Sequence, residues 1–96
     1  MAKKIYKYRL FTDGAITSLK DRFTKIMAIQ NQMGGVYAWI ELDDDSPVVG
    51  LDLVAIGTGW EFGEELNDFF FVDTVQEGEY VWHFFGRIIE EEDLGG

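Results

Sequence analysis

The sequence predicts a mainly β protein: a small antiparallel β-sandwich or partly open barrel of about six strands. The first residues alternate between charged and apolar types, which is typical of a strand with one buried face. Later segments are rich in β-branched and aromatic residues, and short stretches of Gly, Asp or Pro separate them, as turns require. With 96 residues, of which 47% are hydrophobic and 16% aromatic, the chain can form one core but not two.

The first segment predicts a strand with a cationic outer face. Lys3, Lys7 and Arg9 fall on one side of an extended chain, and Tyr6 and Tyr8 fall on the other. The Thr-Asp-Gly triplet that follows is typical of a turn, because Asp bonds to nearby backbone and Gly accepts a positive φ. We therefore expect the chain to reverse direction there.

Residues 16–31 fit both a helix and a strand. Their apolar residues follow helical spacing from Ile16 to Met27, but the later ones also alternate with period two. We choose a strand for 24–31, because the Met-Gly-Gly triplet at 33–35 suits a hairpin turn and precedes a segment of high β-propensity. A helix over 16–31, which would make the fold α+β, is the alternative.

The second half predicts three more strands. An Asp-Asp-Asp-Ser-Pro turn leads into a strand over 48–56, and a polar loop with one helical turn at 64–67 follows. The last two strands are expected over 69–75 and 80–88, joined by a two-residue turn at 77–78.

That turn fixes the register expected for the last hairpin. Val75 would face Tyr80, and Val72 would face His83. Both sides of the hairpin are apolar, so we expect it to be central in the fold. One side would meet the core, and other strands or a second subunit would cover the other, which predicts a homo-oligomer.

We expect one β domain over 1–89 and an acidic flexible tail at 90–96. The chain carries its charge unevenly: the part up to Lys25 has seven basic and two acidic residues, and the rest has Arg87 and sixteen acids. The net charge of −10 opposes nonspecific nucleic-acid binding, and apolar runs of four or five residues are too short to span a membrane. Without cysteine the chain has no disulfide framework, which favours a reduced, cytoplasmic setting.

Nothing in the sequence indicates catalysis. His83 is the only histidine, and in the expected register it has no carboxylate beside it to orient its ring. We therefore expect it to be a partly buried residue packed between Val81 and Phe85. Neither serine lies in a nucleophile motif, and the three aspartates at 43–45 lack the spacing of a calcium loop. The expectation is a protein that is not an enzyme and has no cofactor or metal.

Gly57-Thr58-Gly59 is the most suggestive short motif. Two glycines around a hydroxyl allow backbone N–H groups to approach an anion, although the motif also suits a tight bend at a strand end. The adjacent Trp60 has a ring on which a base can stack. Together with the basic first strand, from the same or another subunit, these residues predict a pocket for a phosphorylated nucleotide. The predicted ligand-binding residues are Lys3, Lys7, Arg9, Gly57, Thr58, Gly59, Trp60 and His83.

Four motifs in order resemble a family of small uncharacterised proteins encoded by bacteriophages and prophages. They are Ile-Tyr-Lys-Tyr at 5–8, the turn from Gln30 to Gly35 before Trp39, Gly-Thr-Gly at 57–59 and Val-Trp-His-Phe at 81–84. The resemblance covers about residues 3–86 and supports a strand at 24–31. It implies a viral origin and a bacterial host, and it carries over no catalytic residue.

These observations predict a phage protein that neutralises a host factor in the host cytoplasm without catalysis. The first hypothesis is an anti-defence sponge that sequesters a small ligand, such as a nucleotide immune signal. The second is an acidic inhibitor of a cationic host defence protein, which would bind through Asp43, Asp44, Asp45, Glu64 and Glu65. The third is a virion or assembly component, in which the basic strand of one copy docks on the acidic body of the next.

Overall fold

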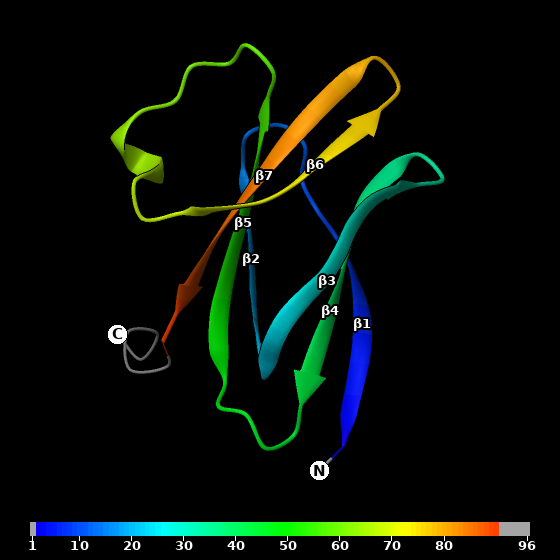
Figure 1. Cartoon of the computed structure of the whole chain (residues 1–96), viewed down its shortest axis with the longest axis vertical. Coiled ribbons are helices and arrows are strands. Elements are labelled where there is room, and N and C mark those ends of the chain that lie inside the picture. Colours follow the sequence, from blue (N-terminus) through cyan, green and yellow to red (C-terminus); the bar gives the residue numbers. More distant parts are fainter. Residues whose placement is uncertain (1, 91–96) are drawn as a thin grey trace.

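The computed structural model describes residues 2–90, and these form two antiparallel β-sheets (Figure 1). The residues at 91–96, which make up most of the predicted acidic tail, lie outside the described part of the chain. The elements are β1 (Lys3–Arg9), β2 (Ile16–Asp21), β3 (Phe23–Gln32), β4 (Gly35–Asp43), β5 (Val49–Gly57), the short 3-10 helix η1 (Glu64–Leu66), β6 (Phe70–Glu77) and β7 (Tyr80–Ile89).

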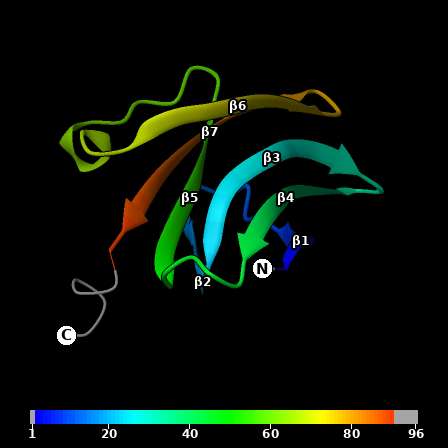
Figure 2. The same cartoon turned by 60° about the horizontal axis from the view of Figure 1, so that its bottom comes forward.

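The strand order is β1-β4-β3 in one sheet and β2-β5-β7-β6 in the other. The two sheets face each other, with β3 beside β6, and neither closes into a barrel (Figure 2). The described residues span only 17 Å in the shortest direction, which is the thickness expected for two packed sheets. The predicted mainly β class with antiparallel sheets is therefore confirmed. Within residues 2–90 no helix is long and apolar enough to cross a membrane.

Side chains that alternate along the strands form the core between the sheets. In β4, Val36, Ala38 and Ile40 point inward and are almost completely buried, whereas Tyr37 and Trp39 point outward. The opposite sheet contributes its own inward-facing residues from β5, β6 and β7. The core of buried residues consists of Leu10, Phe23, Ile29, Val36, Ala38, Ile40, Leu42, Val49, Leu51, Leu53, Ala55, Val75, Trp82 and Phe84.

The helix considered for residues 16–31 is wrong, and the strand expected at 24–31 is confirmed as part of β3. Bulges in β3 explain why the sequence suggested a helix, because each inserts one extra residue into the strand. Phe23, Ile26 and Ile29 all turn toward the core, and their spacing of three imitates one face of a helix. The segment before them forms β2, a seventh strand that the sequence did not reveal.

The last hairpin differs from its predicted register by two residues. Its turn is Gly78-Glu79, with Gly78 at a φ of 60°, so that Glu77 pairs with Tyr80. A two-residue hairpin turn of this kind needs glycine in its first position, and the sequence interpretation placed Gly78 second. Val75 therefore faces Trp82 instead of Tyr80. The hairpin is also not central, because β6 forms an edge and β5 and β7 lie inside the sheet.

Candidate functional site

The structure divides the predicted ligand-binding residues between the two sheets. Lys3, Lys7 and Arg9 lie on β1, in the three-stranded sheet, whereas Gly57 and Trp60 lie at the end of β5 in the other sheet. None of the three cations lines the pocket beside Trp60. The predicted composite pocket is therefore not formed within one copy of the chain, because β1 pairs with β4 and turns its cations to the outer face of its own sheet.

The outer face of the three-stranded sheet combines cations, aromatic rings and amides. Strand pairing places Lys7 opposite Trp39, Arg9 opposite Tyr37, and Gln30 on the other side of Tyr37. Because partners in antiparallel strands point to the same side, these side chains share one surface. We call this surface the basic face; it comprises Lys3, Lys7, Arg9, Lys25, Gln30, Gln32, Tyr37 and Trp39.

Lys7 organises the middle of the basic face. Its Nζ lies 4.7 Å from the centroid of the Tyr37 ring and 5.9 Å from that of Trp39. The same Nζ donates a hydrogen bond of 2.9 Å to Oε1 of Gln32. The two rings lie next to each other, with centroids 6.4 Å apart and planes inclined by 57°. This arrangement holds one ammonium group against two ring faces on an exposed surface.

Gly35 makes room for a second cation beside Tyr37. A Cβ atom at position 35 would lie 3.1 Å from the Tyr37 ring and 3.4 Å from the guanidinium carbon of Arg9. The absence of that Cβ lets both side chains lie over the backbone at the hairpin end.

The basic face differs in charge from the rest of the described chain. Four of its side chains are cationic, and the acids that β4 adds on this side are Glu41 and Asp43. Glu41 accepts a hydrogen bond of 2.8 Å from Thr24 Oγ1. Residues 49–90, in contrast, contain nine acids and Arg87 as their one Lys or Arg. Anions are therefore attracted to the basic face and repelled from the other sheet.

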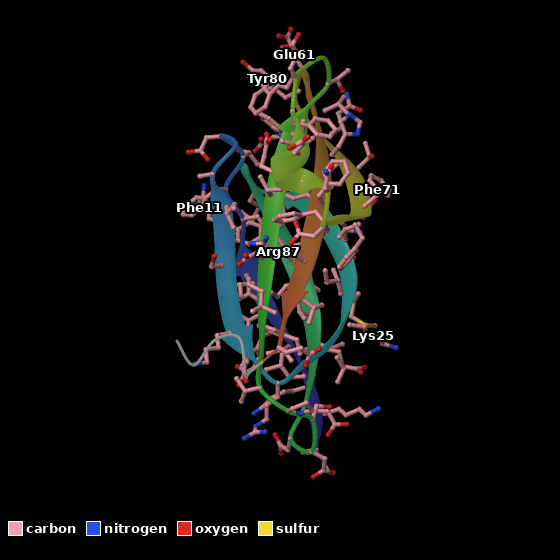
Figure 3. All side chains as sticks on the ribbon, turned by 90° about the vertical axis from the view of Figure 1, so that its left-hand side faces the viewer. Phe11, Lys25, Glu61, Phe71, Tyr80 and Arg87 are labelled. Carbon is pink, nitrogen blue, oxygen red and sulfur yellow. The ribbon has the colours of Figure 1, made fainter. Side chains whose placement is uncertain are left out.

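A second site lies where the end of β5 meets the tip of the β6–β7 hairpin. It is a pocket of about 300 Å³, which we call the aromatic pocket, lined by Gly57, Thr58, Trp60, Glu79, Tyr80, Val81 and Trp82. Trp82 stacks against Tyr80, with centroids 5.6 Å apart and planes inclined by 17°. Trp60 meets Trp82 edge to face, with a centroid distance of 5.4 Å. Figure 3 shows Tyr80 at one end of the molecule, close to the end of the sandwich.

The Gly-Thr-Gly motif ends β5 in a tight bend, as its alternative interpretation expected. The Thr58 N–H donates to the carbonyl of Val81 at 3.2 Å, and the Trp60 N–H donates to the carbonyl of Gly57 at 3.0 Å. These backbone donors are thus already used within the chain. The tight bend, with Gly59 at a φ of 88°, brings the Trp60 ring over Gly57, which has no side chain to obstruct it.

His83 lies between two threonines. Its Nε2 is 2.8 Å from Thr58 Oγ1, and its Nδ1 is 3.1 Å from Thr74 Oγ1. The expectation that Val72 faces His83 is wrong, because the shifted register places Thr74 opposite it. The two hydroxyls hold the imidazole ring in place, and neither supplies the carboxylate that orients the histidine of a catalytic triad.

Residues 1–94 match the family model described as Domain of unknown function (DUF7352). The chain belongs to this family. No curated protein and no solved structure matches the chain. The family description assigns no activity, so we infer the roles of both sites from their geometry.

The acids predicted to bind a partner lie in separate places in this family member. Asp43 ends β4, and Asp44 and Asp45 lie in the turn to β5 at the bottom of Figure 1, where the Asp45 N–H donates to Asp43 Oδ1 at 2.9 Å. Glu64 and Glu65 lie in η1, on the loop between β5 and β6. Hydrogen bonds from backbone N–H groups, first of all that of Gly63, lower the pKa of Glu65. Residues 2–90 contain no cluster of three or more acidic or histidine side chains that could hold a metal ion.

The sequence interpretation missed the partners that complete each site. Tyr37 and Trp39 join the basic face from β4, and Tyr80 and Glu79 join the aromatic pocket from the last hairpin. One signal was present: Tyr37 and Trp39 alternate with the small and aliphatic residues of the same strand, which predicts that they point away from the core. Which strand lies beside β1 cannot be derived from that alternation.

Proposed function

We propose that this protein is a non-catalytic binding protein whose ligand site is the basic face. The ligand class is a phosphorylated compound with a planar ring, of which a nucleotide immune signal is the biological example. Sequestering such a signal in a phage-infected bacterium needs tight binding and no reaction. The viral setting comes from the motif resemblance.

The observation that carries this proposal is Lys7 lying against the rings of Tyr37 and Trp39 on an exposed sheet. Stacking of a base on an aromatic side chain stabilises a complex by roughly 1–3 kcal/mol per base. Lys and Arg beside those rings can pair with phosphate oxygens, and Gln30 and Gln32 supply both donors and acceptors for the edge of a base. The basic face therefore offers partners for each part of a nucleotide.

The charge of the remaining molecule strengthens this assignment. An anionic ligand is repelled by the acids of residues 49–90, and the aromatic pocket is lined by Glu79 and by no lysine or arginine. β1 is an edge strand of its sheet, and its lysines and arginine are exposed to solvent. Electrostatic attraction and repulsion thus direct an anionic ligand to the basic face.

Calorimetric titration with a panel of ligands tests the proposal. The panel contains nucleoside monophosphates, linear and cyclic dinucleotides, adenosine without phosphate, and inorganic phosphate without a ring. We expect a nucleotide to bind and both fragments to bind far more weakly, because the site uses phosphate and ring contacts together. Saturation at a hundredfold excess over Kd should also stabilise the protein by about 2.7 kcal/mol.

Variants locate the binding surface. Lys7→Glu reverses a charge next to both rings, and Trp39→Ala removes a stacking surface, so each should weaken nucleotide binding at least tenfold. Lys20→Glu is the matched control, because Lys20 is exposed on β2 in the other sheet and the charge change is identical. If no nucleotide binds, or if Lys20→Glu weakens binding as much as Lys7→Glu, the proposal is wrong.

A second candidate function, inhibition of a cationic host protein, is favoured by three exposed phenylalanines. Phe62, Phe70 and Phe71 expose 50%, 47% and 58% of their surface, and they lie on or next to the acid-rich loop between β5 and β6. Exposed aromatic groups with acids around them suit a basic protein surface. A partner bound in this way should associate more slowly at high salt and bind Phe62→Ser more weakly. A salt-independent association rate would contradict this alternative.

A further inference from the structure

The aromatic pocket has an electrostatic character opposite to that of the basic face. Its walls include the rings of Trp60, Tyr80 and Trp82, and the one charged side chain among its lining residues is Glu79. A second acid lies beside it, because Glu77 Oε1 accepts a hydrogen bond of 3.0 Å from Nε1 of Trp82. Aromatic ring faces are negative, and so are both carboxylates. The pocket therefore favours a cation and disfavours a phosphate.

The rings leave one side open to solvent. Trp82 is almost completely buried, but Trp60 exposes 45% and Tyr80 exposes 64% of its surface. A ligand entering from solvent thus meets the exposed parts of Trp60 and Tyr80 before it reaches Trp82. The exposed Glu79 belongs to the two-residue turn next to Tyr80, where it can approach a ligand at the rim.

The volume and chemistry together indicate the group that fits. A pocket of about 300 Å³ is at the lower limit for small-molecule sites and suits one side chain better than a whole cofactor. A guanidinium group is planar, stacks on aromatic rings and binds a carboxylate with two parallel hydrogen bonds. We propose that the aromatic pocket binds an arginine side chain of a partner protein, stacked on Trp60 or Tyr80 and paired with Glu79.

Tryptophan fluorescence provides a direct test. Trp39→Phe removes the third tryptophan, which lies on the basic face, so that Trp60 and Trp82 report on the pocket. The probe is N-acetyl-arginine amide, and its matched control is N-acetyl-citrulline amide, which has nearly the same shape but no charge. At constant ionic strength we expect a saturable change in emission with the arginine probe and a much weaker response to citrulline.

Charge variants assign the response to the pocket. Glu79→Gln keeps the shape of an exposed turn residue and removes its charge, so the apparent Kd for the arginine probe should rise by roughly three- to tenfold. Asp44→Asn removes the same charge from the turn between β4 and β5 and should leave the Kd unchanged. Trp60→Leu should abolish most of the response by removing a ring face.

Three results would overturn the proposal: no saturable change, an equal response to citrulline, or an unchanged Kd in Glu79→Gln. Because the Glu79 and citrulline comparisons disturb no buried residue, they remain decisive if Trp60→Leu fails to fold. This proposal does not depend on nucleotide binding. Lys7→Glu should leave the arginine response intact, so the two proposals can fail separately.

Discussion

The outer faces of the two sheets are built from the same kind of alternating strand, yet one is open and the other is covered. The three-stranded sheet exposes cations and rings on its basic face. The four-stranded sheet is overlaid by the loop between β5 and β6, whose Phe62 ring packs 5.7 Å from that of Phe85. Figure 3 shows Arg87 near the middle of this covered side.

Arg87 explains how the covered face is held together. Its Nη2 lies 2.8 Å from Asp52 on β5, and its Nη1 lies 3.2 Å from Asp68 at the end of the loop. Its guanidinium carbon also lies 4.5 Å from the ring centroid of Phe69. These hydrogen bonds to two carboxylates raise the pKa of Arg87. On the covered face, Arg87 thus forms ion pairs that join elements of the fold, whereas the four cations of the basic face are exposed and form no ion pair among residues 2–90.

The largest expected effect comes from removing Arg87. Arg87→Met leaves the buried carboxylate of Asp52 with Ser18 as its hydrogen-bond partner and releases the loop, which should lower the free energy of unfolding by about 3 kcal/mol. Arg9→Met makes the same change on the basic face and should lower the free energy of unfolding by less than about 0.5 kcal/mol. Urea denaturation of both variants gives the two values. Equal losses would contradict the division between a structural face and a binding face.

A smaller loss is expected at Gly57, below the Trp60 ring. A Cβ atom there would lie 2.8 Å from two atoms of that ring, so Gly57→Ala should displace Trp60 and destabilise the protein by about 1–3 kcal/mol. Gly63→Ala is the control, because its Cβ would meet only the flexible carboxylate of Glu65 at 3.2 Å. In a double-mutant cycle, Gly57→Ala should lower the free energy of unfolding much less when Trp60→Ala has already removed the ring. A Gly57→Ala variant as stable as Gly63→Ala would show that the packing of Trp60 is loose.

These examples show which features can be predicted from the sequence. The β class follows from local alternation, and the strand at 24–31 follows from the Met-Gly-Gly turn beside it. Two bulges in β3 change a period of two into a spacing of three, which explains why a helix over 16–31 remained an alternative. The seventh strand, β2, has no clear apolar alternation, because Thr17 is buried and Ile16 is exposed. The prediction for the last hairpin placed its turn at 77–78, one residue before the turn that forms at 78–79. For this reason the partner of His83 is Thr74 and not Val72.

The candidate sites were harder to predict than the strands. The cations of β1 and the motif around Trp60 were both identified, but the prediction joined them into one pocket. Whether they meet depends on which strand pairs with β1, and long-range pairing of that kind has no local signal. Charge separation along the chain, in contrast, correctly indicated a basic region and an acidic region.

The smallest predicted effect concerns the inner side of β1, behind the basic face. Burial, with smaller effects from Asp21 and Tyr6, raises the pKa of Tyr8, whose ring lies 5.8 Å from that of Phe23. The folded protein therefore holds this proton more tightly than the unfolded chain. The resulting stability is complete below the unfolded pKa of about 10 and is lost as the pH rises through the folded value. The difference in unfolding free energy between the wild type and Tyr8→Phe should change only in this alkaline range; a difference that does not vary with pH would contradict the shift.

The most direct test of the central claim is to map nucleotide contacts by amide chemical shifts in NMR. As the nucleotide that binds most tightly in the panel is added, the largest shifts should fall on β1, β4 and β3, around Lys7, Tyr37 and Trp39. The amides of the loop between β5 and β6 and of the aromatic pocket should change little. Shifts that concentrate at Trp60 and Tyr80 instead, or that spread evenly over both sheets, would contradict the assignment of the basic face as the ligand site.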